Sequence, residues 1–288
     1  MVNWLSQLQR GRPSVALDVV PILATLWMDL SRRTYPLLMN SQTPWTLNRE
    51  EFDLDQVLAA KNGSVAVIIP AKNEAATVGA VLEAVKGTTG LIDELIVVDD
   101  DSTDDTATVA ERHGATVIAT SFSSGKGNAL SVGVAKTTAD YLVFLDADVT
   151  NTDPTFVPRL LQPLFARPEI ALVKGYYERP LLHMPTGGGR VNELTARPIL
   201  SLLYPGLGEV RQPLAGETAL RRSVLSNIAL EPTYAVEIGL LIDVATTIGV
   251  SSIAQVDLGV RVHRNRPLEE LRPMAVQVLR CALERKGR

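Results

Sequence analysis

The chain has 288 residues, and its 28 basic and 32 acidic side chains give a formal net charge of −4. A negative total argues against a general nucleic-acid-binding protein, because such proteins attract the phosphate backbone with a basic surface. With 46% apolar and 21% charged residues, the composition excludes a disordered or a fibrous chain. The single cysteine, Cys281, can form neither an intramolecular disulfide nor a thiol-rich zinc site, which favours a reducing compartment.

No membrane-spanning segment is predicted, since no window reaches the roughly 20 apolar residues that such a helix needs. The longest apolar candidate, Val19 to Met28, contains Pro21 and lies between Asp18 and Asp29. We therefore expect a soluble cytoplasmic protein. An interfacial helix around Trp27 stays open as an alternative, although such an apolar stripe is more often a docking helix or a subunit contact.

Between Ser64 and Asp148 strands and helices alternate regularly, as expected for a parallel sheet that is covered on both faces. Apolar runs predict strands at Val65–Ile69, Leu95–Val98, Thr116–Ala119 and Tyr141–Leu145, with Pro70 ending the first of them. Helices are predicted around Val78–Val85, after the cap-type residues Ser102 to Asp105, and over Gly125–Ala139. This pattern is typical of a nucleotide-binding half-domain.

The sequence after Thr155 is less regular. A helix around Phe156–Phe165 and a strand at Ile170–Val173 precede a Gly- and Pro-rich stretch from about Lys174 to Thr233. A helix over Val236–Ile248, a strand over Ile253–Val262 and a terminal helix follow. We expect the Gly- and Pro-rich stretch to shape an acceptor substrate, because loops on a rigid sheet carry specificity.

The fourth predicted strand ends in Asp146-Ala147-Asp148. Alternation along an extended segment turns Asp146 and Asp148 to the same side, so both carboxylates can meet one ligand outside the carboxyl edge of the sheet. Hard oxygen ligands suit Mg²⁺ or Mn²⁺, which neutralises a diphosphate leaving group. An isolated Asp-x-Asp motif usually lies in a solvated loop. Here the motif follows a hydrophobic strand directly, and this position favours a functional role.

Seven carboxylates lie between Asp93 and Asp105, including Asp99-Asp100-Asp101 at the end of the second predicted strand. Three adjacent ionised groups repel one another, so a structural or functional role is needed to explain why they occur together. We expect Asp99 or Asp100, and in particular Asp100, to accept hydrogen bonds from a base or a ribose. The alternative is a role in turns and caps, which suits Asp104 and Asp105.

Two shorter segments also carry groups that can bind a ligand. Pro70-Ala71-Lys72-Asn73-Glu74 closes the first predicted strand, and its amide and carboxylate can bind a sugar, although the segment alone is typical of a turn and a helix start. In Gly125-Lys126-Gly127-Asn128, the lysine could meet a phosphate, with flanking glycines allowing close approach. The Walker spacing is absent, so this segment alone indicates a surface turn.

Taken together, these four segments resemble the nucleotide-sugar half of a GT-A glycosyltransferase. The downstream segments Gly187–Leu194, Gln212–Glu217, Tyr234–Asp243 and Val260–Leu268 resemble those of the glucosyl-3-phosphoglycerate synthases. The resemblance covers approximately Trp45 to Arg280. It implies an α/β GT-A fold with an N-terminal helical extension at residues 1–45, a Rossmann-like nucleotide-sugar half at 46–150, and a mixed-sheet acceptor half with a C-terminal helix at 151–288.

The resemblance also implies an activity and a set of site residues. The expected enzyme is a retaining hexosyltransferase, a homodimer that uses Mg²⁺ or Mn²⁺ to transfer glucose from UDP-glucose to 3-phosphoglycerate. The implied donor-binding residues are Pro70, Ala71, Lys72, Asn73, Glu74, Asp100, Lys126, Asp146 and Ala147, and the implied metal ligands are Asp148 and His263. The implied acceptor-binding residues are Gly189, Arg190, Asn192, Asn265 and Arg266, and the implied catalytic residues are Glu237, Arg261 and Asp146.

The acceptor of this reaction carries a phosphate and a carboxylate, which calls for fixed donors and positive charge. Arg261, Arg264 and Arg266 lie within six residues, and we expect at least one of them to be a paired or solvated charge instead. Glu237 is expected to open a helix and to position the sugar. A covalent double displacement through Glu237 is the less favoured alternative.

The chain departs from the usual family pattern at several positions. It has Asp99-Asp100-Asp101-Ser102 where members commonly have Asp-Ser-Gly-Ser, Lys72 in place of a small apolar residue, Ala147 in place of Ser, and Asn192 in place of Thr. The first two differences bear on nucleotide preference and the last on the acceptor.

Three other functions stay open at this point. One is a mannosyl-3-phosphoglycerate synthase that uses GDP-mannose, and another is a catalytically silent protein that binds nucleotide sugars. An inverting transferase acting on a polyprenyl phosphate is disfavoured, because no membrane helix is predicted after the catalytic half.

Overall fold

A computed structural model of the chain describes residues 43–87, 90–121, 125–181, 184–187, 189–262 and 267–287. Residues 1–42, most of the predicted N-terminal extension, lie outside the described residues, as do the predicted site residues His263, Asn265 and Arg266 and the neighbouring Arg264.

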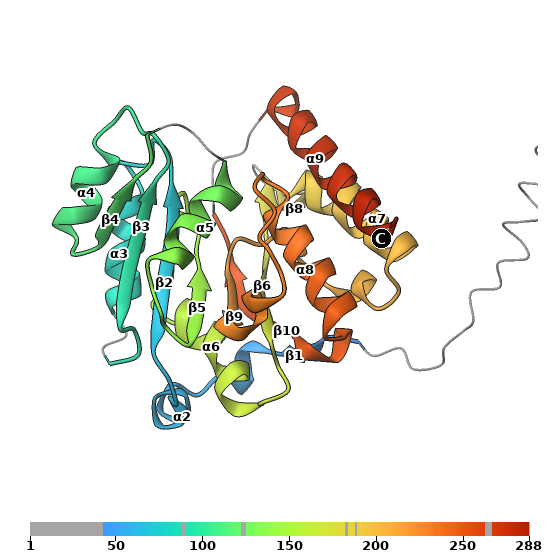
Figure 1. The fold of residues 1–288 in the computed structure, drawn as a ribbon, viewed down its shortest axis with the longest axis horizontal. Helices are drawn as coiled ribbons and strands as arrows, with labels where there is room; N and C mark the ends of the chain where they lie inside the picture. The colour runs from blue at the N-terminus through green and yellow to red at the C-terminus, as the bar shows by residue number, and fades with distance from the viewer. Residues whose placement is uncertain are drawn as a thin grey trace, which may run out of the picture. The chain divides into compact units, whose positions relative to one another are not determined.

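The core of the fold is one mixed sheet with the strand order β1-β10-β6-β9-β5-β2-β3-β4 (Figure 1). Its strands are β1 (Trp45–Leu47), β2 (Val65–Ala71), β3 (Glu94–Asp99), β4 (Thr116–Ala119), β5 (Tyr141–Phe144), β6 (Leu172–Glu178), β9 (Thr218–Arg221) and β10 (Ile253–Val260). Paired strands are parallel except that β9 runs antiparallel to β5 and β6. Because β9 pairs with both, the two predicted halves share one continuous sheet. A separate antiparallel pair is formed by β7 (Pro180–Leu181) and β8 (Met184–Gly187).

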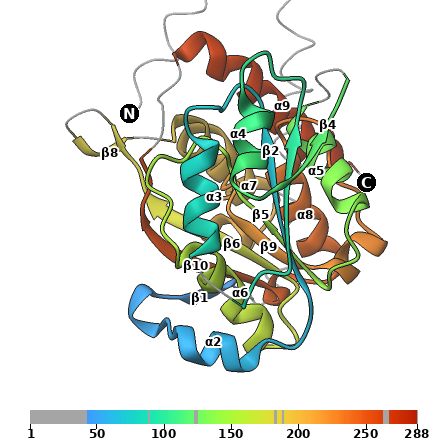
Figure 2. The same cartoon turned by 90° about the vertical axis from the view of Figure 1, so that its left-hand side faces the viewer.

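Helices cover both faces of this sheet (Figures 1 and 2). They are α2 (Leu54–Ala60), α3 (Val78–Lys86), α4 (Thr106–Arg112), α5 (Lys126–Ala135), α6 (Phe156–Ala166), α7 (Arg197–Leu203), α8 (Val236–Thr247) and α9 (Leu268–Lys286). Alternation along β2 explains the layers, since successive side chains of a strand point to opposite faces. Val65, Val67 and Ile69 join the core with α3 and α6, whereas Ala66 and Ile68 join the core with α5 and α8.

The structure corrects the predicted end of β2. Pro70 does not end the strand, which continues to Ala71. The last residue of β2 that pairs with β5 is Ile68, whereas pairing with β3 continues through Ala71. A proline is tolerated here because it lies beyond the β5 ladder, where no backbone donor is required.

The structure also corrects the picture of a loose stretch from Lys174 to Thr233. β6 runs on to Glu178, and the stretch contains α7 and the central strand β9. The sequence Thr218–Arg221 is too short and too little β-branched to indicate a strand, and its place between β5 and β6 comes from tertiary pairing. The predicted strand to Val262 ends earlier, at Val260.

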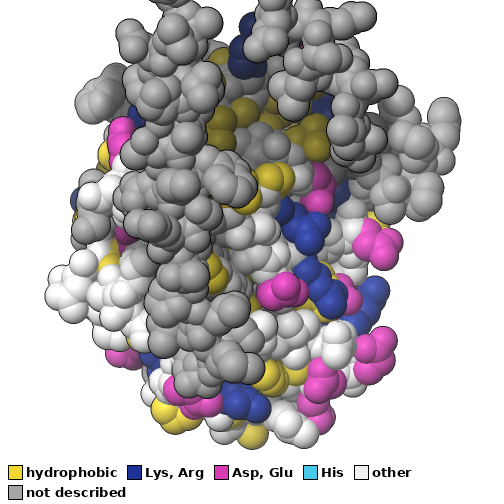
Figure 3. Space-filling model, turned by 90° about the vertical axis from the view of Figure 1, so that its right-hand side faces the viewer, with side chains coloured by type: hydrophobic (Ala, Val, Ile, Leu, Met, Phe, Trp, Pro, Cys, Tyr) yellow, Lys and Arg dark blue, Asp and Glu magenta, His cyan; other side chains and the backbone are white. Residues whose placement is uncertain are grey.

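The surface of the described residues carries charges of both signs. On the face shown in Figure 3, Lys and Arg side chains are interspersed with Asp and Glu. No helix in the described part of the chain combines the length and the apolar character that crossing a bilayer requires.

Candidate active site

A pocket of about 420 Å³ lies beyond the carboxyl ends of β2 and β5, and residues of both predicted halves line it. All the predicted site residues within the described ranges are among them: Pro70, Ala71, Lys72, Asn73, Glu74, Asp100, Lys126, Asp146, Ala147, Asp148, Gly189, Arg190, Asn192, Glu237 and Arg261. The sequence thus predicted which segments converge, and the role of each residue stays a prediction.

Asp146 is the centre of the charged part of the pocket. Its Oδ1 accepts a hydrogen bond from Lys126 Nζ at 2.5 Å, and its Oδ2 accepts one from Arg261 Nη2 at 2.7 Å. Burial alone would raise the pKa of Asp146, but the two cations outweigh burial and hold this pKa well below its usual range. Asp146 is therefore ionised and fixed in orientation at neutral pH.

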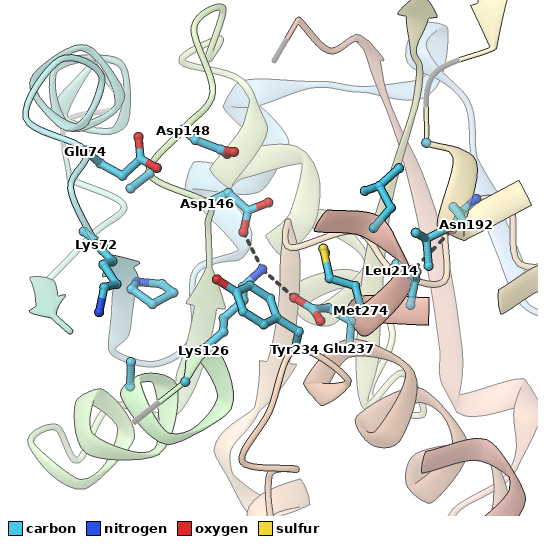
Figure 4. Close-up of a pocket in the computed structure, with 18 of the residues that line it drawn as sticks. Lys72, Glu74, Lys126, Asp146, Asp148, Asn192, Leu214, Tyr234, Glu237 and Met274 are labelled. Atoms are coloured by element: carbon cyan, nitrogen blue, oxygen red, sulfur yellow. Dashed lines mark hydrogen bonds and ion pairs between the residues drawn. The ribbon is translucent and has the colours of Figure 1, made fainter. Parts of the chain in front are cut away.

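Lys126 joins the two halves of the site, as Figure 4 shows. Its Nζ lies 2.5 Å from Asp146 Oδ1 and 2.5 Å from Oε1 of Glu237, near the start of α8. Burial opposes the charge of Lys126, but the two carboxylates outweigh burial and raise its pKa above the ordinary value. The amine therefore stays protonated and serves as a cationic bridge.

The glycines beside Lys126 serve a packing role that the sequence did not reveal. A β-carbon on Gly127 would overlap the carbonyl oxygen of Glu231, so the close approach they permit is to this backbone. Gly125 has a φ of 90°, in the left-handed region that favours glycine. This packing sets the start of α5 against the segment that leads into α8, and the predicted approach to a phosphate stays a prediction.

Arg261 is almost fully buried, with 2% of its surface exposed, and three carboxylates surround it. Its Nη1 donates to Tyr177 Oη at 2.8 Å and to Glu217 Oε2 at 3.0 Å, and its Nη2 also donates to Asp148 Oδ1 at 3.1 Å. Burial opposes its charge, but Glu217 and its other partners raise its pKa well above the ordinary value. Of the three arginines expected to face the acceptor, this one is paired within the protein.

Asn73, predicted to bind the donor, braces a turn next to the pocket. Its backbone N–H donates to Ser102 Oγ at 2.9 Å, and its Oδ1 accepts from the Thr103 N–H at 2.8 Å. Its φ is 56°, and that of Asp101 is 64°. The family resemblance places glycine at position 101, and the left-handed backbone supplies the reason; aspartate is among the few other residues that tolerate it.

The aspartates around Asp101 divide between the site and its support. Asp100 lines the pocket, and its Oδ2 accepts from the N–H of Gly125 at 3.3 Å, which ties β3 to the start of α5. Asp104 accepts from the N–H groups of Ala75 at 3.1 Å and of Thr106 at 3.0 Å, which confirms its expected turn role. Asp105 occupies the N-cap of α4, as expected, although its side chain makes no capping hydrogen bond.

The acceptor side of the pocket has a backbone bend and an amide that braces a loop. Gly189 has a φ of 69°. Asn192 is 2% exposed; its Nδ2 donates to Glu193 Oε1 at 2.9 Å and to Arg211 O at 3.3 Å, and its Oδ1 accepts from Leu214 N at 3.3 Å. Its side chain therefore holds the segment from Arg211 to Leu214 in place.

A divalent cation fits the chemistry of Asp148. Its carboxylate lines the pocket with 30% of the side chain exposed, two residues from Asp146, and carboxylate oxygens are the ligands that Mg²⁺ and Mn²⁺ prefer. His263, the other predicted ligand, lies outside the described residues. In the described ranges, no three His, Cys, Asp or Glu side chains group as a metal site.

Sequence reasoning missed several residues of this site. Glu217 is 1% exposed and anchors Arg261, and Tyr177 contacts the same guanidinium. Tyr234 and Met274 line the pocket beside Lys126 and Glu237 (Figure 4). Glu217 lies in a segment that carried the family resemblance, but its role depends on where β9 is placed, which the sequence did not indicate.

Comparison with known proteins identifies relatives of the whole catalytic region. The model of the family "Glycosyl transferase family 2" matches residues 66–182. A glucosyl-3-phosphoglycerate synthase of Mycobacterium tuberculosis is 44% identical over 275 residues, which cover 90% of this chain and 84% of the relative. The synthase of Mycolicibacterium smegmatis is 46% identical over 258 residues, 85% of each chain.

Solved structures agree with the sequence comparison. The Mycobacterium tuberculosis synthase in complex with Mn²⁺, UDP-glucose and phosphoglyceric acid matches with a TM-score of 0.78 and 43% identity, covering 85% of this chain and 88% of that one. The same enzyme with Mg²⁺ and UDP also gives a TM-score of 0.78, covering 85% of this chain and 87% of that one. The predicted GT-A fold is thereby confirmed.

Proposed function

The chain belongs to the family of glucosyl-3-phosphoglycerate synthases, and we propose that it transfers glucose from UDP-glucose to 3-phosphoglycerate, forming glucosyl-3-phosphoglycerate. The observation that carries the proposal is the bridge formed by Lys126 between Asp146 of the donor half and Glu237 of the acceptor half. A transferase needs one site that reaches both substrates, and this bridge lies in a single pocket that extends from Pro70 to Asn192. The relatives' complexes with UDP-glucose and phosphoglyceric acid identify the two substrates.

The geometry supports a proposed task for each charged residue in this reaction. Lys126 and Arg261 fix Asp146 from two sides, so its carboxylate is oriented before the sugar binds. Little free energy is then needed to reorient this group during the reaction. Asp148 and His263 would hold the divalent cation, which when bound neutralises charge on the departing diphosphate.

We infer that glucose is transferred with retention of the α-configuration and without a glycosyl–enzyme intermediate on Glu237. The Glu237 carboxylate lies 2.5 Å from Lys126 Nζ and is 8% exposed. Its negative charge is therefore compensated by Lys126 and its position is fixed, which makes it a poor nucleophile. Its role is then to position Lys126 and the sugar. On the acceptor side, Arg190 and the bend at Gly189 would meet an anionic group, together with Asn265 and Arg266.

Two expectations about the whole protein are also proposals. A homodimer is supported by exposed apolar side chains on neighbouring helices, with Leu202 of α7 72% exposed and Leu283 of α9 55% exposed. A cytoplasmic location is supported by the phosphorylated metabolites that the enzyme would use. Light scattering of the purified protein tests the first, and fractionation of the native host tests the second.

The proposed function is tested by following UDP release with 3-phosphoglycerate, Mn²⁺ and a panel of donors. UDP-glucose should support turnover at least tenfold better than GDP-mannose. Faster turnover with GDP-mannose would favour the mannosyl alternative. Metal-dependent binding of UDP-glucose without any release of UDP would favour a silent binding protein.

A further inference from the structure

Lys174 is a buried cation behind the active site that the mechanism above does not use. It lies in β6 opposite Thr218 of β9, with only 1% of its surface exposed. Its Nζ donates to the carbonyl oxygen of Ala215 at 2.5 Å and to Thr218 Oγ1 at 2.8 Å. Within the described part of the chain no carboxylate lies in ion-pairing distance of this amine, which is unusual, because a buried charge is normally paired.

The segment that Lys174 binds, Ala215–Thr218, carries two supports of the catalytic centre. The backbone of Gly216 packs directly on the carboxylate of Asp146, since a β-carbon on this glycine would overlap that group. Glu217 anchors Arg261, which in turn holds Asp146 and Asp148. A shift of this segment would therefore move both the carboxylate and the guanidinium.

The charge of Lys174 also belongs to the electrostatics of the site. Burial opposes the charged form and lowers its pKa to about 8, and nearby Lys126 acts in the same direction. Glu237, Glu217 and Asp146 favour the charged form and limit this decrease. These groups lie in α5, in α8, in the loop after β5 and in the loop before β9, so the charge of Lys174 is coupled to that of the catalytic centre.

We propose that Lys174 is a positioning residue of the transfer reaction, which holds the Ala215–Thr218 segment so that Gly216 and Glu217 fix Asp146 and Arg261. It touches neither substrate nor metal in this role. The inference rests on the proposed function for its kinetic consequence, whereas its structural consequence is independent of the substrates.

Lys174→Met tests the proposal, because methionine fills a similar volume without the amine. Arg159→Met is the matched control, since Arg159 is also a buried cation, 9% exposed, but lies in α6 away from the pocket. We would measure kcat with UDP-glucose and 3-phosphoglycerate, the affinity for UDP and Mn²⁺ by calorimetry, and amide hydrogen exchange across residues 212–221. Thr218→Val, which removes one acceptor and keeps the lysine, serves if Lys174→Met fails to fold.

The expected result for Lys174→Met is a kcat at least tenfold lower, UDP affinity within threefold of the wild type, and at least tenfold faster exchange at residues 215–218. The alkaline limb of the kcat profile, expected near pH 8 in the wild type, should be lost in this variant but kept in Thr218→Val. Arg159→Met should keep kcat within twofold and exchange in this segment unchanged. The proposal would be overturned if Lys174→Met showed unchanged exchange and a kcat within twofold of the wild type. If Lys174→Met does not fold, the same two results for Thr218→Val would overturn it. If the wild type shows no turnover, the proposed function fails, and the exchange measurement still decides the role of Lys174.

Discussion

Gly216 and Asp146 are in direct contact, with no room between them for a single additional carbon. The backbone at Gly216 lies against the carboxylate that Lys126 and Arg261 hold, and an added β-carbon would meet all three carboxyl atoms of Asp146. The position of the Asp146 carboxylate is thus set on one side by Lys126 and Arg261 and on the other by the backbone of Gly216.

Gly216→Ala is therefore expected to displace Asp146 and to lower kcat/KM for UDP-glucose by at least a hundredfold. Misplacing a reacting group by about 1 Å costs on that order in rate. Gly287→Ala is the matched control, because a β-carbon there would meet only the Glu284 carbonyl at an ordinary 3.7 Å. Steady-state kinetics of both variants check the prediction, and a Gly216→Ala enzyme within threefold of wild type would contradict it.

Lys126→Met should reduce both activity and stability, since it leaves the half-buried Asp146 and the buried Glu237 without their shared cation. Removing one partner of a buried ion pair costs about 3 kcal/mol or more. Denaturant unfolding at pH 7 measures this loss. Lys61→Met removes an exposed pair with Asp93 and should cost less than about 1 kcal/mol. Equal losses in the two variants would show that the bridge contributes no more than a surface pair.

The depressed pKa of Asp146 predicts an acid-sensitive fold. Because this pKa is lowered in the folded state, its contribution to stability is fully present above the ordinary aspartate pKa of about 3.9 and is lost as pH falls through the range below it. Asp146→Asn removes the titrating group, so its free energy of unfolding should fall less steeply between pH 5 and about pH 3. Guanidinium unfolding curves at several pH values check this, and parallel pH profiles for both proteins would refute it.

Asp148→Asn tests the metal assignment separately from the sugar. The variant should need at least tenfold more Mn²⁺ for half-maximal rate, because an amide oxygen is a weaker ligand than a carboxylate. UDP binding measured without metal should change less than threefold. Asp101→Asn, an exposed neighbour on the donor side, is the control and should leave the Mn²⁺ requirement unchanged. An unaltered requirement in Asp148→Asn would remove this residue from the metal site.

The parts of this site that the sequence predicts are those whose residues lie close together in the sequence. Asp146 and Asp148 were expected together on one side of an extended segment, and Arg261 Nη2 does contact both carboxylates, but β5 ends at Phe144 and Asp148 lies in the turn that follows it. The link from Lys126 to Glu237, in contrast, requires α5 to dock beside α8. That docking depends on Gly127 fitting against Glu231, a contact between residues far apart in the sequence.

Contacts between distant segments also account for the residues on the acceptor side that the sequence did not predict. β9 carries no strong strand signal, so its antiparallel insertion between β5 and β6 was not predicted, and neither was the anchoring of Arg261 by Glu217. The resemblance at residues 212–217 marked this segment as part of the family pattern without giving its role. Asn192 has a structural role that the sequence did not indicate, since its buried amide braces the loop from Arg211 to Leu214, while its predicted contact with the acceptor stays a prediction.

The most direct test of the account is to identify the product formed from UDP-glucose and 3-phosphoglycerate with Mn²⁺. Mass spectrometry and proton nuclear magnetic resonance of the purified product should show one hexose joined to phosphoglycerate through an α-anomeric linkage. We expect this product from the wild type and much less of it from Lys126→Met. A β-anomer would contradict retention, and the absence of any hexosyl phosphoglycerate with the wild-type protein would contradict the proposed function itself.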